Sequence, residues 1–337
     1  MTAANKLAVV AVGGNSLIRD KQHESIPDQS EEAAITAHYI ADMIEAGWNV
    51  VVTHGNGPQM GFVLRRSELS LHEVPPVPMD YASADLQGGI GYMFLKALYN
   101  EFRKRRIVRK AVAVVTQTIV DRHDPAFTNP TKPIGSQLNE PTARRLAAQQ
   151  GWTIEEDAGH GWRRVVPSPL PRTIVELEMI RCLAKAGYVV IACGGGGIPV
   201  VKDAEGNLVG VEAVIDKDFA SSLLARDIGA ELLLVSTAVE KVAINFKRPD
   251  QQWLDRMTVA EAKRYFADNQ FDKGSMGPKI QAVIEFLEGG GWMGLITNPP
   301  NIGRALAGET GTFIVREGAP AFTFHNYLLR RTYGSIT

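Results

Sequence analysis

The sequence predicts an α/β fold in which helices cover a mostly parallel sheet. Short apolar runs alternate with helical patterns along the chain, and 337 residues with 45% hydrophobic content are ample for a large packed core in one or two domains. Three of the apolar runs, residues 7–12, 49–53 and 188–193, end directly in glycine-rich turns. Ligands of such sheets bind beyond the carboxyl ends of the strands, which is where all three turns fall.

The first segment of the chain predicts a β-α-β unit. Residues 7–12 are an apolar run typical of a buried strand, and residues 49–53 resume as a strand with β-branched residues. Between them, Asp28 and Glu31 resemble a helix-start capping pair, and we expect the helix to continue to Gly47. Its apolar residues recur on one helical face: Ala33, Ala37, Ile40 and Ile44.

The same alternation continues downstream and indicates a sheet covered by helices. Helical patterns are expected at residues 86–106, 172–186, 218–228, 258–268 and 278–287. Strands are expected between them at residues 111–116, 188–193, 231–236 and 292–297.

Two stretches interrupt the alternation. Residues 121–171 are rich in proline, glycine and charge, with one helical pattern at 141–149, and are expected to leave the sheet as an excursion. Residues 198–215 carry alternating valines around 203–207 and predict a hairpin just before Lys217. Such a hairpin would aim this lysine at the crevice.

Composition excludes several classes of protein. Acidic and basic residues nearly cancel, 37 against 36, so net charge does not favour nucleic acid or an anionic membrane as a partner. The basic run at 103–106 is explained by a solvated helix end. Cys182 and Cys193 give no disulfide framework, and neither a leader pattern nor an apolar run of membrane-spanning length is present. We expect a cytoplasmic protein.

The glycine turns are suited to holding an anion, and a phosphate is the expected ligand. Backbone N–H groups approach a ligand closely where no Cβ intervenes. The sequence nevertheless lacks the G-x-x-x-x-G-K-[ST] loop and the G-x-G-x-x-G dinucleotide turn, and it has neither H-R-D nor D-F-G of protein kinases. Any phosphoryl chemistry must therefore use another scaffold.

Six motifs, in this order, resemble those of the carbamate kinases, a branch of the amino-acid-kinase family. The likeness covers residues 6–316. Its motifs are Val12-Gly13-Gly14-Asn15, Thr53-His54-Gly55-Asn56-Gly57-Pro58-Gln59, Lys132-Pro133-Ile134-Gly135, Cys193-Gly194-Gly195-Gly196-Gly197-Ile198-Pro199, Val214-Ile215-Asp216-Lys217-Asp218 and Gly274-Ser275-Met276-Gly277-Pro278-Lys279.

The resemblance implies a single domain, residues 1–337, folded as a three-layer α/β/α sandwich. Residues 121–171 would form a small protruding lid subdomain over the active site. Residues 1–215 would be the carbamate and phosphoryl lobe, and 216–316 the nucleotide lobe. A homodimer is also implied. Residues 317–337 would be a C-terminal extension, whose apolar side chains we expect to dock on the body or on a dimer partner.

The implied reaction is carbamoyl phosphate + ADP = carbamate + ATP with Mg²⁺, expected to run toward ATP synthesis in the breakdown of arginine or other nitrogen compounds. Carbamate is already an anion, so no general base is needed, and catalysis reduces to positioning anions and neutralising charge. By resemblance the catalytic residues are Lys132, Lys217, Asp218 and Lys279. Asp218 would organise the lysines, and it is also placed to cap a helix beginning near Phe219.

The remaining site residues follow from the same resemblance. Gly13, Gly14, Asn15, Gly55, Asn56, Gly57, Gly195 and Gly196 would bind the substrate and the phosphoryl group. Ser236, Thr237, Ala238, Val242, Met276 and Gly277 would border the nucleotide. We assign no catalytic role to His54 or His160, and no protein ligand to a metal, because Mg²⁺ would be held mainly by nucleotide phosphates.

Two departures from the family pattern leave the substrate range open. Ser136-Gln137 stands where carbamate kinases usually continue with proline and an aromatic residue, and Glu240 stands where aspartate is usual. One alternative is a kinase for another small carboxylate, such as an N-acetylated amino acid, on the same fold. The other is a non-catalytic sensor of nucleotide or carbamoyl phosphate.

Overall fold

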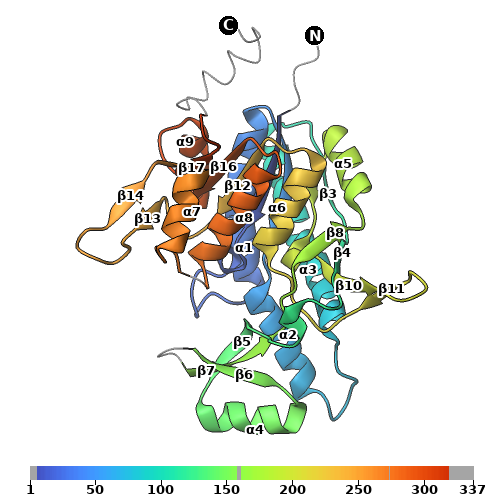
Figure 1. The fold of residues 1–337 in the computed structure, drawn as a ribbon. Coiled ribbons are helices and arrows are strands. Elements are labelled where there is room, and N and C mark those ends of the chain that lie inside the picture. Colours follow the sequence, from blue (N-terminus) through green and yellow to red (C-terminus); the bar gives the residue numbers. More distant parts are fainter. Residues whose placement is uncertain (1–5, 158–160, 273, 319–337) are drawn as a thin grey trace, which may run out of the picture.

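A computed structural model describes residues 6–157, 161–272 and 274–318, without the side chains of Asn15, Ser136 and Asp157. Figure 1 shows a large body of sheet and helices, with a small subdomain protruding from its lower end. The expectations for His160 and for most of the extension, residues 319–337, lie outside the described residues.

An eight-stranded sheet forms the centre of the body. Every neighbouring pair is parallel except β16 with β17, so the sheet is mostly parallel as predicted. Its strands, in spatial order, are β15 (Arg256–Thr258), β17 (Thr312–Val315), β16 (Met293–Thr297), β12 (Leu232–Ser236), β1 (Lys6–Val12), β2 (Trp48–His54), β9 (Val189–Ile191) and β3 (Ala111–Ala113).

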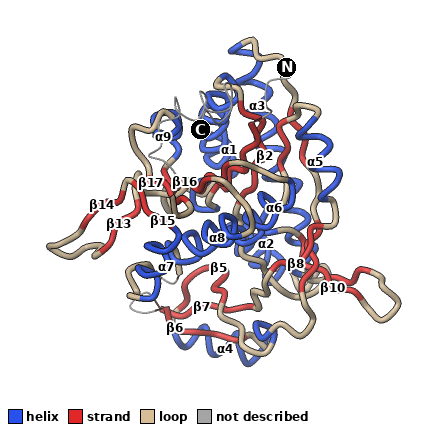
Figure 2. Tube along the Cα trace, turned by 45° about the horizontal axis from the view of Figure 1, so that its top comes forward, coloured by secondary structure: helices blue, strands red, loops and turns tan. Residues whose placement is uncertain are grey.

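Helices cover both faces of this sheet, and the alternation of side chains along each strand explains why. In β1, Val10 and Val12 pack into the core on one face, whereas Val9 and Ala11 pack into the core on the other. The first face is covered by α1 (Ile26–Glu45), α3 (Met79–Arg105) and α9 (Ile302–Leu306). The second is covered by α5 (Leu177–Lys185), α6 (Lys217–Ile228), α7 (Val259–Ala267) and α8 (Met276–Glu288). The α/β/α sandwich is confirmed, and Figure 2 shows helices on either side of the strands.

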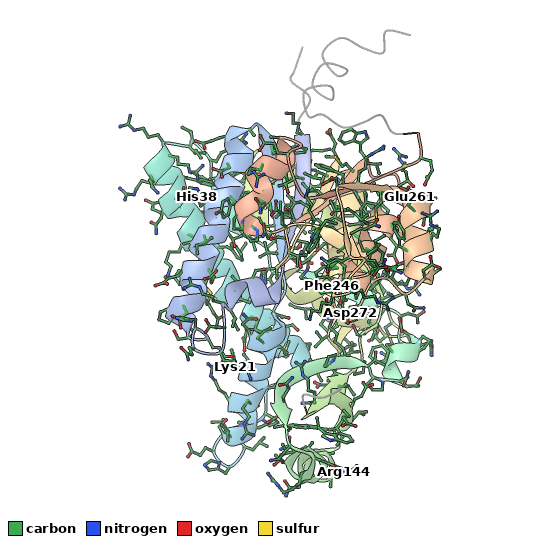
Figure 3. The ribbon with its side chains drawn as sticks, turned by 90° about the vertical axis from the view of Figure 1, so that its left-hand side faces the viewer. Lys21, His38, Arg144, Phe246, Glu261 and Asp272 are labelled. Carbon is green, nitrogen blue, oxygen red and sulfur yellow. The ribbon has the colours of Figure 1, made fainter. Side chains whose placement is uncertain are left out.

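The small subdomain is built on an antiparallel sheet of β5 (Lys132–Leu138), β7 (Gly161–Val166) and β6 (Thr153–Asp157). Helix α4 (Glu140–Gln150) packs on it, close to the predicted 141–149. Figure 3 shows Arg144 of α4 at the end of the subdomain that lies away from the body. Helix α2 (Gly57–Leu69) packs against β5 and joins the subdomain to the body.

Smaller elements complete the described chain. A four-stranded sheet contains β11 (Leu208–Gly210), β10 (Ile198–Lys202), β4 (Gln117–Val120) and β8 (Pro171–Ile174), and its β10–β11 pair is the predicted hairpin. A second hairpin joins β13 (Val242–Ile244) to β14 (Gln252–Leu254). Short 3-10 turns are η1 (Gly14–Leu17), η2 (Pro125–Phe127), η3 (Gly194–Gly196) and η4 (Pro299–Asn301).

The capping pair of the first helix lies three residues earlier than predicted, at Ser25 and Asp28 instead of Asp28 and Glu31. Ser25 is the N-cap of α1, and its hydroxyl and backbone N–H exchange hydrogen bonds with Asp28, which is the third helical residue rather than the cap. The helix ends at Glu45, two residues before Gly47. The predicted apolar face is buried, as expected.

Three other elements also differ from prediction. Helix α2 was missed because it begins at Gly57-Pro58, inside a motif interpreted as a glycine turn, although proline suits the first turn of a helix. Helix α3 begins at Met79, seven residues earlier than predicted. The start of the expected helix at 172–186 is instead strand β8, which pairs with β4, so α5 begins only at Leu177.

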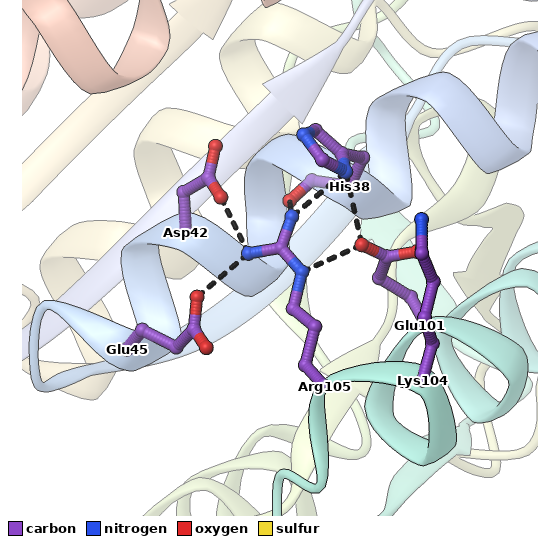
Figure 4. A network of polar contacts seen from close by, with 6 residues as sticks. All are labelled: His38, Asp42, Glu45, Glu101, Lys104 and Arg105. Atoms are coloured by element: carbon purple, nitrogen blue, oxygen red, sulfur yellow. Dashed lines mark hydrogen bonds and ion pairs between the residues drawn. The ribbon is translucent and has the colours of Figure 1, made fainter.

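The basic run at 103–106 is not a simple solvated helix end. Figure 4 shows the Arg105 guanidinium between α1 and α3, donating to Asp42 at 2.5 Å, Glu45 at 2.7 Å and Glu101 at 2.6 Å. Its side chain is only 14% exposed, and these carboxylates hold its pKa above the ordinary value although burial opposes this. Arg105 therefore ties the two helices together, while Lys104 is 72% exposed.

The turn after β9 requires glycine for two reasons. Gly195, Gly196 and Gly197 all have positive φ, which disfavours residues with a Cβ. A Cβ on Gly196 would also lie 2.6 Å from the carbonyl oxygen of Ile215, which immediately precedes the α6 cap Asp216. The turn and the start of α6 are therefore in direct backbone contact.

This contact predicts a difference between two alanine substitutions. Gly206 has φ +88°, close to the +95° of Gly196, but a Cβ there meets no atom within 4 Å. Gly206→Ala should cost about 1–2 kcal/mol from backbone strain alone, and Gly196→Ala should cost clearly more. Urea unfolding of both variants measures this, and equal losses would contradict the close packing.

Candidate active site

A cleft of about 730 Å³ lies at the carboxyl edge of the central sheet. It is bordered by the turns that follow β1, β2 and β12 and by the N-termini of α6 and α8. Of the residues proposed from sequence, those lining it are Gly13, Gly14, Gly55, Asn56, Gly57, Lys132, Gly195, Lys217, Asp218, Ser236, Thr237, Ala238 and Lys279.

The first two glycine turns touch each other at the floor of the cleft. The Gly55 N–H donates to the carbonyl of Val12 at 2.9 Å, and a Cβ on Gly55 would lie 2.6 Å from the Gly14 nitrogen and 3.1 Å from the Lys217 side chain. Only glycine permits this approach. The turns can therefore present backbone donors beside a lysine, which is how anions are held.

Asp218 joins two lysines from different helices. Its Oδ1 accepts from Lys217 Nζ at 2.5 Å, and its Oδ2 accepts from Lys279 Nζ at 3.1 Å. Asp218 is 4% exposed, Lys217 11% and Lys279 16%. Both lysines stand in the first turns of their helices, where backbone N–H groups and the helix dipole also favour an anion.

Burial and charge act against each other in this cluster. Burial raises the pKa of the Asp218 carboxyl, but the ammonium groups of Lys217 and Lys279 outweigh it and lower this pKa to about 2. Burial lowers the pKa of Lys217, and the charge of Lys279 lowers it further, whereas the carboxylate of Asp218 raises it. The carboxylate is thus ionised at neutral pH and supports two cations that repel each other.

Lys132 reaches the cleft from the first residue of β5, and its partner was missed from sequence. Its Nζ donates to Asp216 Oδ2 at 2.5 Å, while Asp216 Oδ1 accepts from the N–H of Asp218 at 2.8 Å. Asp216 is thus the N-cap of α6, and the expectation that Asp218 caps it was wrong. The sequence signal that could have identified this cap is an aspartate two residues before the expected helix at 218–228.

Two buried polar atoms beside the cleft lack a partner among the described residues. Asn56 is 3% exposed, and its Nδ2 packs so closely on Gly195 that a Cβ there would be 2.2 Å away. Ser236 is fully buried, and its Oγ is also unpartnered. Because a buried unpaired polar group is costly, these atoms indicate positions where a ligand supplies the missing hydrogen bond.

Several of the proposed residues do not line the cleft. Gly196 lies behind Gly195, Val242 is the first residue of β13 and is buried in the core, and Met276 and Gly277 face the packing around α7 and α8. The side chain of Asn15 is outside the described part of the chain. Glu240 accepts a hydrogen bond from Thr310 away from the cleft lining.

The structure adds cleft residues that the sequence analysis did not single out. Arg19 lines the cleft and donates through Nε to Glu32 at 2.8 Å. Asn298, Pro299 and Pro300, which follow β16, also line the cleft. No motif distinguishes these residues, because they meet only through the fold.

His54 lies behind the glycine turns rather than in the cleft. It is 1% exposed, its Nδ1–H donates to the carbonyl of Gly55 at 3.1 Å, and its ring stacks on Phe94. Burial lowers the pKa of His54 to about 4, and the nearby charge of Lys217 acts in the same direction. The neutral ring supports the second turn.

This buried ring predicts a pH-dependent stability. Below pH 6.5 the unfolded chain binds a proton that the folded His54 refuses until about pH 4, so stability falls as pH is lowered through this window. The full effect is roughly 3 kcal/mol. Urea unfolding between pH 7 and pH 4 should show a shallower decline for His54→Gln than for the wild type, and identical slopes would contradict the neutral-ring assignment.

The described residues contain neither a metal-binding cluster of acidic, His or Cys side chains nor a membrane-spanning helix. No group of three or more His, Cys, Asp or Glu side chains there could hold a metal ion. No helix in the described ranges is long and apolar enough to cross a membrane.

Comparison with known proteins places this geometry in a family. The model of the amino acid kinase family matches residues 6–298. The chain is 48% identical to a carbamate kinase of Thermococcus kodakarensis, over 93% of this chain and 100% of the relative. It is 47% identical to a carbamate kinase-like protein of Escherichia coli, over 92% and 99% respectively.

Solved structures show the same relationship to carbamate kinases. A carbamate kinase from Giardia lamblia bound to AMP-PNP superposes with a TM-score of 0.86 and 40% identity, over 93% of this chain and 99% of that one. The chain belongs to the amino acid kinase family, and within it to the carbamate kinases.

Proposed function

We propose that the protein is a carbamate kinase that transfers a phosphoryl group reversibly between carbamoyl phosphate with ADP and carbamate with ATP. One observation carries the proposal: Asp218 holds Lys217 and Lys279 side by side, beside two touching glycine turns. This arrangement concentrates positive charge and backbone donors where two anionic reactants must meet.

The chemistry requires little more than this arrangement. Carbamate is an anion and attacks without a general base, so the main barrier is repulsion between the reactants and charge on the transferred oxygens. Lys217 and Lys279 would neutralise that charge. Because Asp218 has already oriented them, they need little reorganisation during the reaction.

The acceptor and nucleotide would occupy opposite parts of the cleft. Asn56 Nδ2, unpartnered in the described structure, would donate to carbamate, with the turns at Gly14 and Gly55 around the phosphoryl oxygens. Ser236, Thr237 and Ala238 would border ADP, with Ser236 Oγ gaining its missing partner. The AMP-PNP bound to the related kinase supports a nucleotide site. Val242, Met276 and Gly277 would shape the wall behind it.

Mg²⁺ would be bound mainly by the phosphates of the nucleotide. Three carboxylates line the cleft, but each already accepts from a cation: Glu32 from Arg19, Asp216 from Lys132, and Asp218 from two lysines. These residues fit a metal that is bound mostly by phosphate and water. When bound, the ion supplies further neutralisation of phosphate charge.

The lobe division also forms part of this proposal. Residues 121–171 would act as the lid, 1–215 as the carbamate and phosphoryl lobe, and 216–316 as the nucleotide lobe. Lys132 at the start of β5 supports a lid role, since its 2.5 Å contact with Asp216 links the small subdomain to the N-terminus of α6. A cytoplasmic location and a catabolic, ATP-forming direction complete the proposal.

Loss of one lysine should abolish most turnover. Lys279→Met keeps the bulk of the side chain but removes its charge, and we expect kcat for ATP formation to fall by about 10²–10³-fold. Lys263→Met is the matched control, because this lysine pairs with Glu288 on the exposed surface. A coupled assay with carbamoyl phosphate, ADP and Mg²⁺ measures both.

Three outcomes would reject the proposal. Wild-type protein without turnover but with tight ADP binding would indicate a sensor. Turnover with an N-acetylated amino acid and none with carbamate would indicate a different kinase. A Lys279→Met variant within a few-fold of wild type would remove the proposed role of the lysine pair.

We also propose that the chain forms a homodimer through α3. Tyr81, Tyr92 and Tyr99 lie near one helical face and are 66%, 63% and 69% exposed, with Gly88 on the same face. A Cβ on Gly88 would meet no atom within 4 Å, so another helix could approach closely. Aromatic residues are enriched in protein interfaces, which favours this face over a solvated one.

A charge on this face should separate the dimer. Tyr92→Glu should give the monomer mass by size exclusion with light scattering at micromolar concentration. Trp253→Glu, which changes another exposed aromatic residue, 52% exposed on the β13–β14 hairpin, should remain dimeric. A monomeric wild type, or a dimeric Tyr92→Glu variant, would contradict the proposed interface.

A further inference from the structure

A second cavity lies where α2 meets the small subdomain. It has a volume of about 140 Å³ and shares no lining residue with the cleft. Its walls come from α2, β5, α4 and β7, and its apolar surface includes Leu64, Ile134, Leu146 and Trp152. None of these residues has a role in the proposed reaction.

The charges around this cavity favour an anion. Arg65, Arg145 and Arg164 line it against one carboxylate, Glu68, which already accepts from Arg65 at 3.3 Å. Arg145 donates to the neutral Gln149. Positive charge is therefore in excess.

Arg164 is the most unusual of these cations. Its guanidinium stacks over the ring of Trp152 at 4.9 Å, and no carboxylate of the described residues forms an ion pair with it. Burial lowers the pKa of Arg164, while the more distant Glu68 and Glu212 oppose the shift. A stacked guanidinium still offers in-plane N–H donors to a carboxylate.

Volume limits what the cavity can hold. An apolar cavity of about 150 Å³ accepts a molecule of the size of benzene, so the ligand would carry one ring or a branched chain of similar size. The apolar walls would contact that body, and the arginines would contact an acidic group. A small organic carboxylate has both parts.

The cavity is also connected to the cleft through β5. Gly61 of α2 approaches Gly135 of β5 so closely that a Cβ on Gly61 would lie 2.6 Å from the Gly135 Cα, and both glycines line the cavity. The same strand begins at Lys132, which binds Asp216 in the cleft. A ligand lodged between α2 and β5 would therefore fix the position of this lysine.

We propose that this cavity binds a small organic carboxylate, one aromatic ring or a branched chain in size, and that binding controls the position of Lys132 through β5. The binding step is independent of the proposed reaction. The effect on turnover rests on the carbamate kinase activity.

Benzoate is the probe for the binding step, with the uncharged benzamide as its matched control. Calorimetric titration of the full chain should give saturable benzoate binding and at least tenfold weaker benzamide binding. Arg164→Gln should weaken benzoate at least tenfold. Leu146→Phe, which keeps every arginine and occupies part of the cavity, should also weaken benzoate binding at least tenfold, provided both variants keep the wild-type circular dichroism spectrum.

Three controls exclude other binding sites. Lys217→Met alters the cleft and should leave benzoate affinity within twofold of wild type, as should saturating ADP. Arg248→Gln, on the loop between β13 and β14, should do the same. No saturable binding, competition by ADP, or unchanged affinity in Leu146→Phe would overturn the proposed site.

The proposed effect of the cavity on Lys132 is tested by a separate kinetic measurement. Saturating benzoate should change KM for carbamoyl phosphate at least twofold in the wild type and leave it unchanged in Leu146→Phe. Benzoate that binds without any kinetic effect on an active enzyme would overturn the link to Lys132. An inactive wild type that still binds benzoate would instead count against the proposed function alone.

Discussion

The active-site architecture depends on a single buried carboxylate that supports two lysines. Without Asp218, the ammonium groups of Lys217 and Lys279 would repel each other in a partly desolvated cleft, and each would lose charge or turn toward solvent. With it, both are held on the same side of the cleft before any substrate binds. The cluster is therefore an anion site that is formed in advance.

The fold supplies every component of this cluster at one edge of the sheet. Parallel strands bring the turns after β1 and β2 together, and the absence of a Cβ at Gly55 lets them approach Lys217. Helices α6 and α8 both begin at this edge, so their first turns deliver Lys217 and Lys279. His54 supports the turn from behind without a charge of its own.

Much of the body could be predicted from sequence because its signals are local. The strand at 7–12 is apolar throughout since both faces are buried, and α7 has a capping box, Thr258 with Glu261, at its predicted start. The boundaries were wrong where two local signals compete, as at Gly57-Pro58, which starts α2 within a glycine motif. Strand β8 is defined by its pairing with β4, which no local pattern reveals.

The cleft was predictable only in part. The motifs identified the lysines and the glycine turns, but the partner of Lys132 lies 84 positions away at Asp216, and that contact exists only once the small subdomain is folded against α6. The two unpartnered atoms, Asn56 Nδ2 and Ser236 Oγ, likewise depend on burial by distant elements. Residues such as Arg19 belong to no motif and join the cleft through tertiary packing alone.

The support that Asp218 gives to the lysine pair is tested most directly by the pKa of Lys217, measured by NMR titration of its labelled side chain in the wild type and in Asp218→Asn. In the wild type the pKa of Lys217 should lie below that of exposed lysines, because the group is buried beside Lys279, and it should fall further once the carboxylate is removed. A Lys217 that titrates like an exposed lysine and is unaffected by Asp218→Asn would contradict a buried lysine pair held by Asp218.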